Sequence, residues 1–220
     1  MSVARAMFAG PGARRALVDG ARGEVEIVLQ GGGGYVRLGS SGWVLLTEPG
    51  APFGPLSVTV DALNRLELPP GAPAEVTRGW LFVGDSALSL ERMRVRPCAV
   101  AGAGSSAACA SLPPPPVQLQ AGIAALAGAR LTDAVQLLAG LGEGLTPAGD
   151  DVLAGYAAAR FALGTPVAIS PVAAGRVSPL GLAYLRCAER GELPGELRSW
   201  GSTSGIALAW GMNAAVMQFN

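Results

Sequence analysis

Residues 140–156 read Gly-Leu-Gly-Glu-Gly-Leu-Thr-Pro-Ala-Gly-Asp-Asp-Val-Leu-Ala-Gly-Tyr, and mostly apolar runs lead into this stretch and out of it. The order predicts a helix, a glycine loop and a second helix. Threonine is a good N-cap and proline fits the first helical position, so we expect Thr146 to cap a helix that begins at Pro147. The carboxylates of Asp150 and Asp151 then fall in or just after the first turn, where the helix dipole favours negative charge.

This glycine loop is a candidate ligand site. Glycines before a helix start let backbone N–H groups face an anion such as phosphate or carboxylate. Two carboxylates would repel a bare phosphate, so they indicate either donor groups on the ligand or a bridging cation, for which Mg²⁺ is the candidate. The stretch is neither a Walker A loop, which needs a lysine, nor a dinucleotide fingerprint, which needs a preceding strand. The alternative is a tight helix–helix turn, because caps and turns use these same residue types.

A longer pattern in this stretch carries a resemblance. Gly-Leu-Gly-x-Gly-Leu-Thr-Pro-x-Gly-Asp-Asp-x-Leu-x-Gly resembles the signature of a bacterial family of otherwise uncharacterised proteins that includes the AllH subunit of oxamate carbamoyltransferase. Residues 201–205, Gly-Ser-Thr-Ser-Gly, resemble that family's second signature. The chain departs from the family pattern at Glu143, where proline is common, at Ala148, where serine is common, and at Ser202, where histidine is expected. These departures concern the ligand site and not the fold.

The resemblance implies carbamoyl transfer in a multi-subunit enzyme, in which oxalurate and phosphate exchange with oxamate and carbamoyl phosphate. With it, we expect the two glycine-rich segments to converge on one site for a small anion. Asp150 and Asp151 are the candidates for catalysis or for holding a cation. The candidates for ligand binding come from both segments and are Gly142, Gly144, Leu145, Thr146, Gly149, Ser202, Thr203, Ser204 and Gly205. Two alternatives remain: a non-catalytic assembly subunit, and a stand-alone enzyme of another reaction.

Composition limits the chemistry that the chain can perform. Its 220 residues are enough for one large domain or two small ones. Half of them are hydrophobic, so the chain can bury a sizeable core. There is no histidine, so imidazole catalysis and imidazole metal ligands are excluded. The sixteen basic residues are all arginines, so a lysine Schiff base is excluded as well. The arginines balance sixteen acids and form no cluster that would follow a phosphate backbone, so we expect no nucleic-acid partner.

The cysteines and the apolar runs indicate in which cellular compartment the protein is expected. Cys98, Cys109 and Cys187 match no zinc pattern, and we expect them to be reduced thiols in a cytoplasmic protein. No run reaches the ~18 apolar residues of a membrane span, and the first residues lack the apolar core of a signal peptide. We therefore expect no membrane partner.

The first half of the chain is strand-like. Runs rich in β-branched and aromatic residues occur at 24–29, 35–38, 43–47, 56–60, 80–83, 87–90 and 92–96. Short strands at regular spacing predict an antiparallel sheet or a small barrel. The last run alternates strictly, with Arg92, Arg94 and Arg96 on one face, which is typical of a half-exposed strand; the alternative is an anion-binding face.

A composition break separates this half from the next. Residues 98–116 are mostly alanine, glycine and serine and end in four consecutive prolines, which cannot continue a strand ladder. Beyond the break, helical patterns cover 117–129, 131–139, 147–163, 178–191 and 206–219. We therefore expect an α+β chain with a β-rich domain at 1–97, a linker at 98–116 and an α-helical domain at 117–220.

Overall fold

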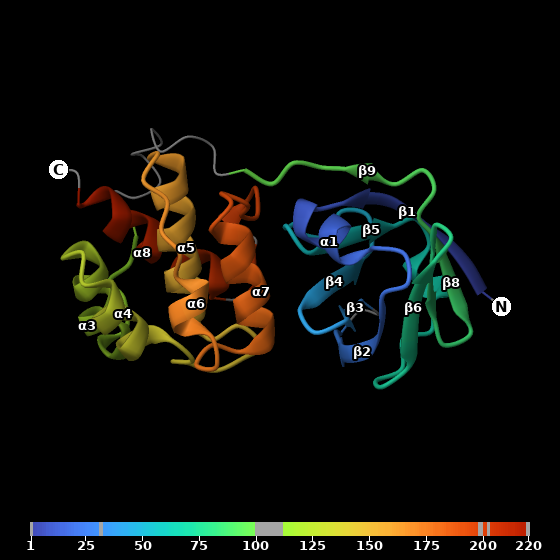
Figure 1. Ribbon diagram of the computed structural model, residues 1–220, viewed down its shortest axis with the longest axis horizontal. Coiled ribbons are helices and arrows are strands. Elements are labelled where there is room, and N and C mark those ends of the chain that lie inside the picture. The colour runs from blue at the N-terminus through green and yellow to red at the C-terminus, as the bar shows by residue number, and fades with distance from the viewer. Residues whose placement is uncertain (1, 31–32, 100–111, 198–199, 202, 219–220) are drawn as a thin grey trace. The chain divides into compact units, whose positions relative to one another are not determined.

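The computed structural model describes residues 2–30, 33–99, 112–197, 200–201 and 203–218. The chain divides into two compact units, Met1–Cys98 and Ala99–Asn220. Strands make up the first unit and helices the second, as the ribbon diagram shows (Figure 1). The predicted α+β class is thus confirmed. The predicted boundaries at 97 and 116 stay a prediction, because most of the predicted linker lies outside the described residues.

The first unit is an eight-stranded closed sheet with one added strand. Its strands are β1 (Ser2–Ala9), β2 (Arg22–Val28), β3 (Gly34–Leu38), β4 (Gly42–Thr47), β5 (Ser57–Val60), β6 (Pro73–Thr77), β7 (Trp80–Val83), β8 (Ser86–Ser89) and β9 (Arg94–Val95). The order is β5-β4-β3-β2-β6-β7-β8-β1-β9, and β5 also pairs with β1, which closes the ring. The pairs β1–β8, β4–β5 and β1–β9 are parallel, and the other pairs are antiparallel.

Side-chain alternation fills the inside of this barrel. Val36, Val44, Leu46 and Val58 are buried in its core, while Arg37 and Thr59, next to them on β3 and β5, are partly exposed. One helix, α1 (Pro11–Ala16), and a 3₁₀ turn, η1 (Leu63–Arg65), interrupt the strands. Closure leaves no long unpaired edge, which is how small barrels avoid edge-to-edge association.

Two strands were not predicted from the sequence. In β1 the inward positions are Ala4 and Ala6, and alanine has a low strand propensity, so this run does not resemble a strand. In β6 the first residue is Pro73, which the sequence places in a turn cluster; proline is tolerated at the first residue of a strand. The predicted arginine strand at 92–96 is shorter than expected, since only β9 pairs, and both of its residues are exposed.

The second unit is a bundle around one buried helix. Its helices are α3 (Val117–Ala127), α4 (Leu131–Leu138), α5 (Ala148–Ala162), α6 (Ser170–Ala173), α7 (Pro179–Ala188) and α8 (Ser204–Val216). In α5 every residue from Gly149 to Ala159 is buried. From Val152 to Ala159 this helix is apolar around its whole circumference, as a helix enclosed by others must be. No helix among the described residues has both the length and the hydrophobicity that crossing a membrane requires.

The helices α5 and α8 touch through glycines. A Cβ atom placed at Gly155 would lie 2.0 Å from the carbonyl oxygen of Leu208, and one at Gly211 would lie 1.9 Å from that of Val152. Only glycine fits at these two positions, so the backbones of the two helices are in direct contact. This packing holds the start of α8 beside the start of α5.

Helix boundaries follow the predictions with three differences. Ser178 caps α7, because its Oγ accepts the N–H of Gly181 at 2.9 Å. The prediction that Thr146 caps α5 is wrong: the N-cap position is Pro147, and no side chain caps the helix there. The last helix begins at Ser204 and not at 206, and α6 lies in a segment that the sequence leaves as a connection.

We expect Gly211→Ala to lower the free energy of unfolding by about 1–3 kcal/mol, because its Cβ would overlap the Val152 carbonyl and force α5 and α8 apart. The measurement is urea unfolding followed by circular dichroism. Gly195→Ala is the matched control, since a Cβ at Gly195 meets no atom within 4 Å. Equal stability of the two variants would contradict the close packing of α5 on α8.

Candidate functional site

Asp150 joins three segments of the helical unit. It lies in the first turn of α5, and only 1% of its surface is exposed. Its Oδ1 accepts the backbone N–H of Gly140 at 2.7 Å, and its Oδ2 accepts that of Ser178 at 3.1 Å. The carboxylate therefore ties the start of α5 to the end of the α4 segment and to the start of α7.

The start of α7 is shaped to receive this carboxylate. A Cβ at Gly181 would lie 2.4 Å from Oδ2 of Asp150, so glycine is required there. The hydroxyl of Ser178 also donates to the carbonyl of Leu145 at 3.0 Å, which fixes the end of the glycine loop. Ser178 was not predicted as a site residue. The Ser-Pro cap at 178–179 was the only signal, and it marks a helix start without indicating what lies next to it.

Several backbone amides that were expected to face a ligand have partners inside the protein. The N–H of Gly149 donates to the carbonyl of Leu141 at 2.8 Å. Those of Asp150 and Asp151 donate to the carbonyl of Pro147 at 2.8 and 3.2 Å. A Cβ at Gly149 would lie 1.9 Å from the Leu138 carbonyl oxygen, so this glycine serves helix packing. The negative group that the backbone N–H donors bind at this corner is therefore the side chain of Asp150 and not a ligand.

Asp151 has different surroundings. It is 5% exposed, and the hydroxyl of Thr146 donates to its Oδ2 at 3.4 Å. The same hydroxyl lies 3.3 Å from Oγ of Ser204, the first residue of α8. Burial raises the pKa of Asp151 from its ordinary 3.8 to about 7; hydrogen bonds from Ser204 and Thr146 oppose the rise, and the charge of Asp150 adds to it. Residues from both glycine-rich segments therefore meet at Asp151.

The pKa of Asp150 is also raised. Burial is the main cause, and the hydrogen bonds that Gly140 and Ser178 donate oppose it. Two adjacent carboxyl groups thus sit in one turn with different partners. Asp150 receives two backbone N–H groups and a hydrogen bond from the Ser178 side chain, which hold a carboxylate in place. Asp151 contacts the hydroxyl groups of Thr146 and Ser204, which can both donate and accept hydrogen bonds.

Most of the remaining predicted residues belong to the glycine loop or to the start of α8. Gly142 and Gly144 adopt φ angles of +119° and +94°, which favour glycine, and the loop they form is exposed. Thr203 is exposed at the N-cap position of α8 without a side-chain cap bond. Gly205 is buried, and a Cβ there would lie 1.6 Å from the carbonyl oxygen of Leu197. Ser202 lies outside the described residues.

The two other departures from the family pattern lie at the surface of this corner. Glu143 is exposed in the glycine loop, and Ala148, the first residue of α5, is partly exposed. Neither touches the carboxyl group of Asp150 or of Asp151 through a hydrogen bond or ion pair in the part of the chain that the structure describes.

The residues here do not fit the proposed Mg²⁺. Within the described residues no three side chains of His, Cys, Asp or Glu come together as a possible metal site. Both oxygens of Asp150 accept N–H groups, and a side chain 1% exposed leaves no room for the waters that Mg²⁺ retains.

Comparison with known proteins identifies the same segment. The family described as oxamate carbamoyltransferase subunit AllH matches the chain over residues 138–196. The resemblance predicted from the first signature is thus confirmed over this segment, which runs from the end of α4 through α5 and α7. No curated protein and no solved structure matches the chain.

We expect Asp150→Asn to lower the free energy of unfolding by about 1–3 kcal/mol. An asparagine amide would direct its own N–H₂ group at one of the two backbone N–H donors, leaving that donor without an acceptor. Urea unfolding measures the change. Asp133→Asn is the control, because Asp133 is an exposed residue in a surface ion pair with Arg130, and we expect a change within about 0.5 kcal/mol. Equal stability of both variants would contradict the role given to Asp150.

The raised pKa of Asp151 predicts a dependence of stability on pH. A carboxyl group whose pKa is higher in the folded chain stabilises the fold most at low pH, and that contribution is lost as pH rises from about 4 to about 7. The variant Asp151→Asn does not titrate. From pH 4 to pH 7 the wild type should therefore lose stability relative to the variant. The difference between their free energies of unfolding should change by on the order of 2 kcal/mol in favour of the variant. A difference that stays constant from pH 4 to pH 8 would show that the pKa of Asp151 is ordinary.

Proposed function

We propose that this chain is a subunit of an oxamate carbamoyltransferase-type enzyme and that its helical unit binds a small anionic substrate between the glycine loop and the start of α8. One observation carries the proposal: within the segment that matches the AllH family, Asp151 and Thr146 meet Ser204 of the second glycine-rich segment. A packing role alone does not require a carboxyl group of raised pKa beside two hydroxyl groups at an exposed loop.

The reaction needs a group that accepts a proton at neutral pH. In carbamoyl transfer the amide nitrogen of oxamate forms a bond to the carbamoyl carbon, the bond from that carbon to the phosphate oxygen breaks, and the nitrogen loses a proton. Asp151, with a pKa of about 7, takes that proton, because a base works best when its pKa is near the working pH. The hydroxyl of Thr146 connects Asp151 to the partly exposed Ser204 and so offers the proton a path.

In this proposal the glycine loop binds the anionic substrate. Residues 142–145 are exposed and precede the start of α5, where the helix dipole is positive. The internal bonds of the Gly149 amide shift the proposed anion contact from the helix itself to this loop and to the hydroxyls of Thr146, Thr203 and Ser204. Asp150 is then a positioning residue, because it acts on the loop through Gly140 and on Leu145 through Ser178.

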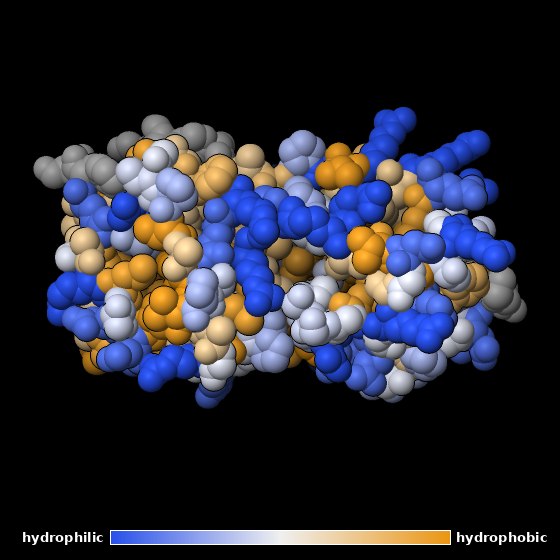
Figure 2. Space-filling view, in the orientation of Figure 1, coloured by the Kyte–Doolittle hydropathy of each residue, from blue (hydrophilic) through white to orange (hydrophobic). Residues whose placement is uncertain are grey.

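The surface of the helical unit supports assembly with other subunits. Figure 2 shows patches of hydrophobic side chains on the visible face of this unit. Its large exposed apolar residues are Val117, Leu137, Leu145, Phe161, Val172, Ile206 and Met217. Extended apolar surface on a folded protein is typical of an interface with another protein.

A second candidate is a subunit without catalytic residues. It is favoured by Asp150, whose two oxygens are both used within the fold. In that case the signature Gly-Asp-Asp would serve the packing of α5 against α7, and the matched segment would be a structural framework.

The test combines binding and activity. We expect phosphate, oxamate or carbamoyl phosphate to raise the melting temperature of the chain, and Thr146→Val to remove this shift because the variant lacks the hydroxyl. Asp151→Asn should lower kcat of the assembled enzyme by about 100-fold or more while leaving KM nearly unchanged, as loss of a general base does. Asp133→Asn is again the control for both measurements. Full activity of an assembled enzyme carrying Asp151→Asn would favour the subunit without catalytic residues.

A further inference from the structure

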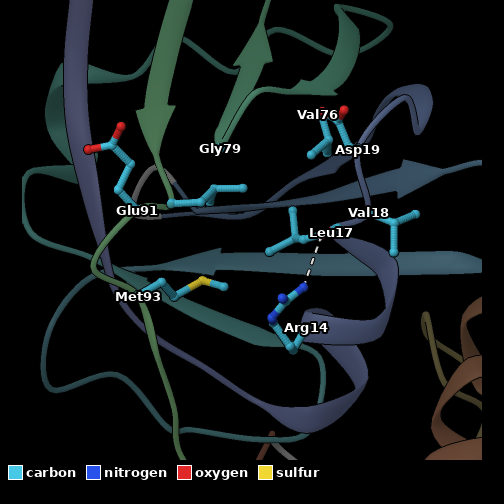
Figure 3. A pocket seen from close by; sticks show the side chains of 9 residues that line it. Arg14, Leu17, Val18, Asp19, Val76, Gly79, Glu91 and Met93 are labelled. Carbon is cyan, nitrogen blue, oxygen red and sulfur yellow. Dashed lines mark hydrogen bonds between the residues drawn. The ribbon is translucent and has the colours of Figure 1, made fainter.

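The β-barrel unit contains a hollow that the proposed function does not use. It measures ≈ 490 Å³ and lies beside α1. Figure 3 shows side chains from three segments around it: α1 and the connection that follows, β6 with its turn to β7, and the connection from β8 to β9. The lining residues are Arg14, Leu17, Val18, Asp19, Val76, Gly79, Leu90, Glu91 and Met93. Its volume falls within the range of small-molecule sites.

Backbone and side-chain hydrogen bonds hold the walls of this hollow together. Oδ1 of Asp19 accepts the backbone N–H of Arg78 at 2.7 Å, and the N–H of Leu90 donates to the carbonyl of Gly79 at 2.8 Å. The N–H of Gly20 donates to the carbonyl of Val76 at 2.7 Å. The three segments are thus cross-linked by hydrogen bonds within the fold, which keep the walls of the hollow in place. A preformed site loses little ordering entropy on binding.

The lining combines an apolar floor with charges of both signs. Leu17 and Val76 are buried, and Met93 is partly exposed beside them. Arg14 reaches toward Leu17 and donates to its carbonyl at 3.3 Å, while Glu91 stands on the other side of the hollow (Figure 3). None of the ion pairs found among the described residues involves Arg14, Asp19 or Glu91.

This arrangement disfavours the substrates of carbamoyl transfer. Oxamate and carbamoyl phosphate are anions without an apolar part, whereas the lining contains two acidic residues and one arginine. A ligand that fits must carry a positive group, a negative group and an apolar body.

We propose that the hollow binds a small zwitterion with an apolar side chain, of the class of free aliphatic amino acids. The ammonium group pairs with Glu91, the carboxylate pairs with the guanidinium of Arg14 on the other side of the hollow, and the aliphatic side chain covers Leu17 and Val76. Charge-assisted hydrogen bonds at both ends fix the orientation, and burial of the aliphatic chain adds affinity. This proposal is independent of the carbamoyltransferase proposal.

Isothermal titration calorimetry of the full chain with three probes tests it. L-leucine carries both charges, L-leucinamide lacks the carboxylate, and 4-methylpentanoate lacks the ammonium group. We expect L-leucine to bind and each analogue to bind about tenfold or more weakly, as loss of one hydrogen bond to a charged group implies.

Two variants test which charged group of the ligand each side chain binds. Arg14→Gln should bind L-leucine and L-leucinamide alike, and Glu91→Gln should bind L-leucine and 4-methylpentanoate alike. Both residues are exposed, so the fold should survive, and circular dichroism checks this. Arg65→Gln, at an exposed site outside the hollow, should keep the wild-type preferences. The proposal is overturned if none of the probes binds, if both variants keep the wild-type preferences, or if oxamate binds in place of L-leucine and Arg14→Gln abolishes that binding.

Discussion

The helical unit depends on a buried carboxylate that must be satisfied. A charge removed from water is costly unless hydrogen bonds replace the water, and Asp150 receives the N–H groups of Gly140 and Ser178 in its place. These two bonds bring together the end of α4, the start of α5 and the start of α7. The glycines around them follow from the same constraint, since a side chain at Gly181 would occupy the position of Oδ2 and one at Gly149 would collide with α4. The segment that matches the AllH family model, residues 138–196, therefore contains packing positions as well as candidate site residues.

The neighbouring acid, Asp151, does not hold these segments together. Asp151 is next along the helix, so it points away from Asp150's partners and meets Thr146, which in turn contacts Ser204. Adjacent acids with different surroundings can have pKa values that differ for that reason. In the function proposed here, Asp150 positions the loop and Asp151 accepts the proton. The glycine contacts between α5 and α8 matter for the same reason, because they place Ser204 within reach of this corner.

The sequence predicts the α+β class, the barrel, most of the helices and the meeting of the two glycine-rich segments. It does not predict β1, whose inward positions are alanines, or the parallel pairs, which depend on how the barrel closes. It also assigns Thr146 to a helix cap, because a threonine before a proline has the local features of a cap. In the structure the hydroxyl of Thr146 finds Asp151 and Ser204, a partner 58 positions away, and no local pattern contains that information. Ser178 was missed as a site residue for the same reason.

The direct test of this account is amide hydrogen exchange of the native chain, read at Gly140 and Ser178. If their N–H groups are held by the buried carboxylate of Asp150, both amides should exchange only with the opening of the whole helical unit, as slowly as the core of α5. Exchange at these two positions as fast as in the exposed loop at 142–145 would mean that Asp150 does not hold the three segments together, and the account of the helical unit would be wrong.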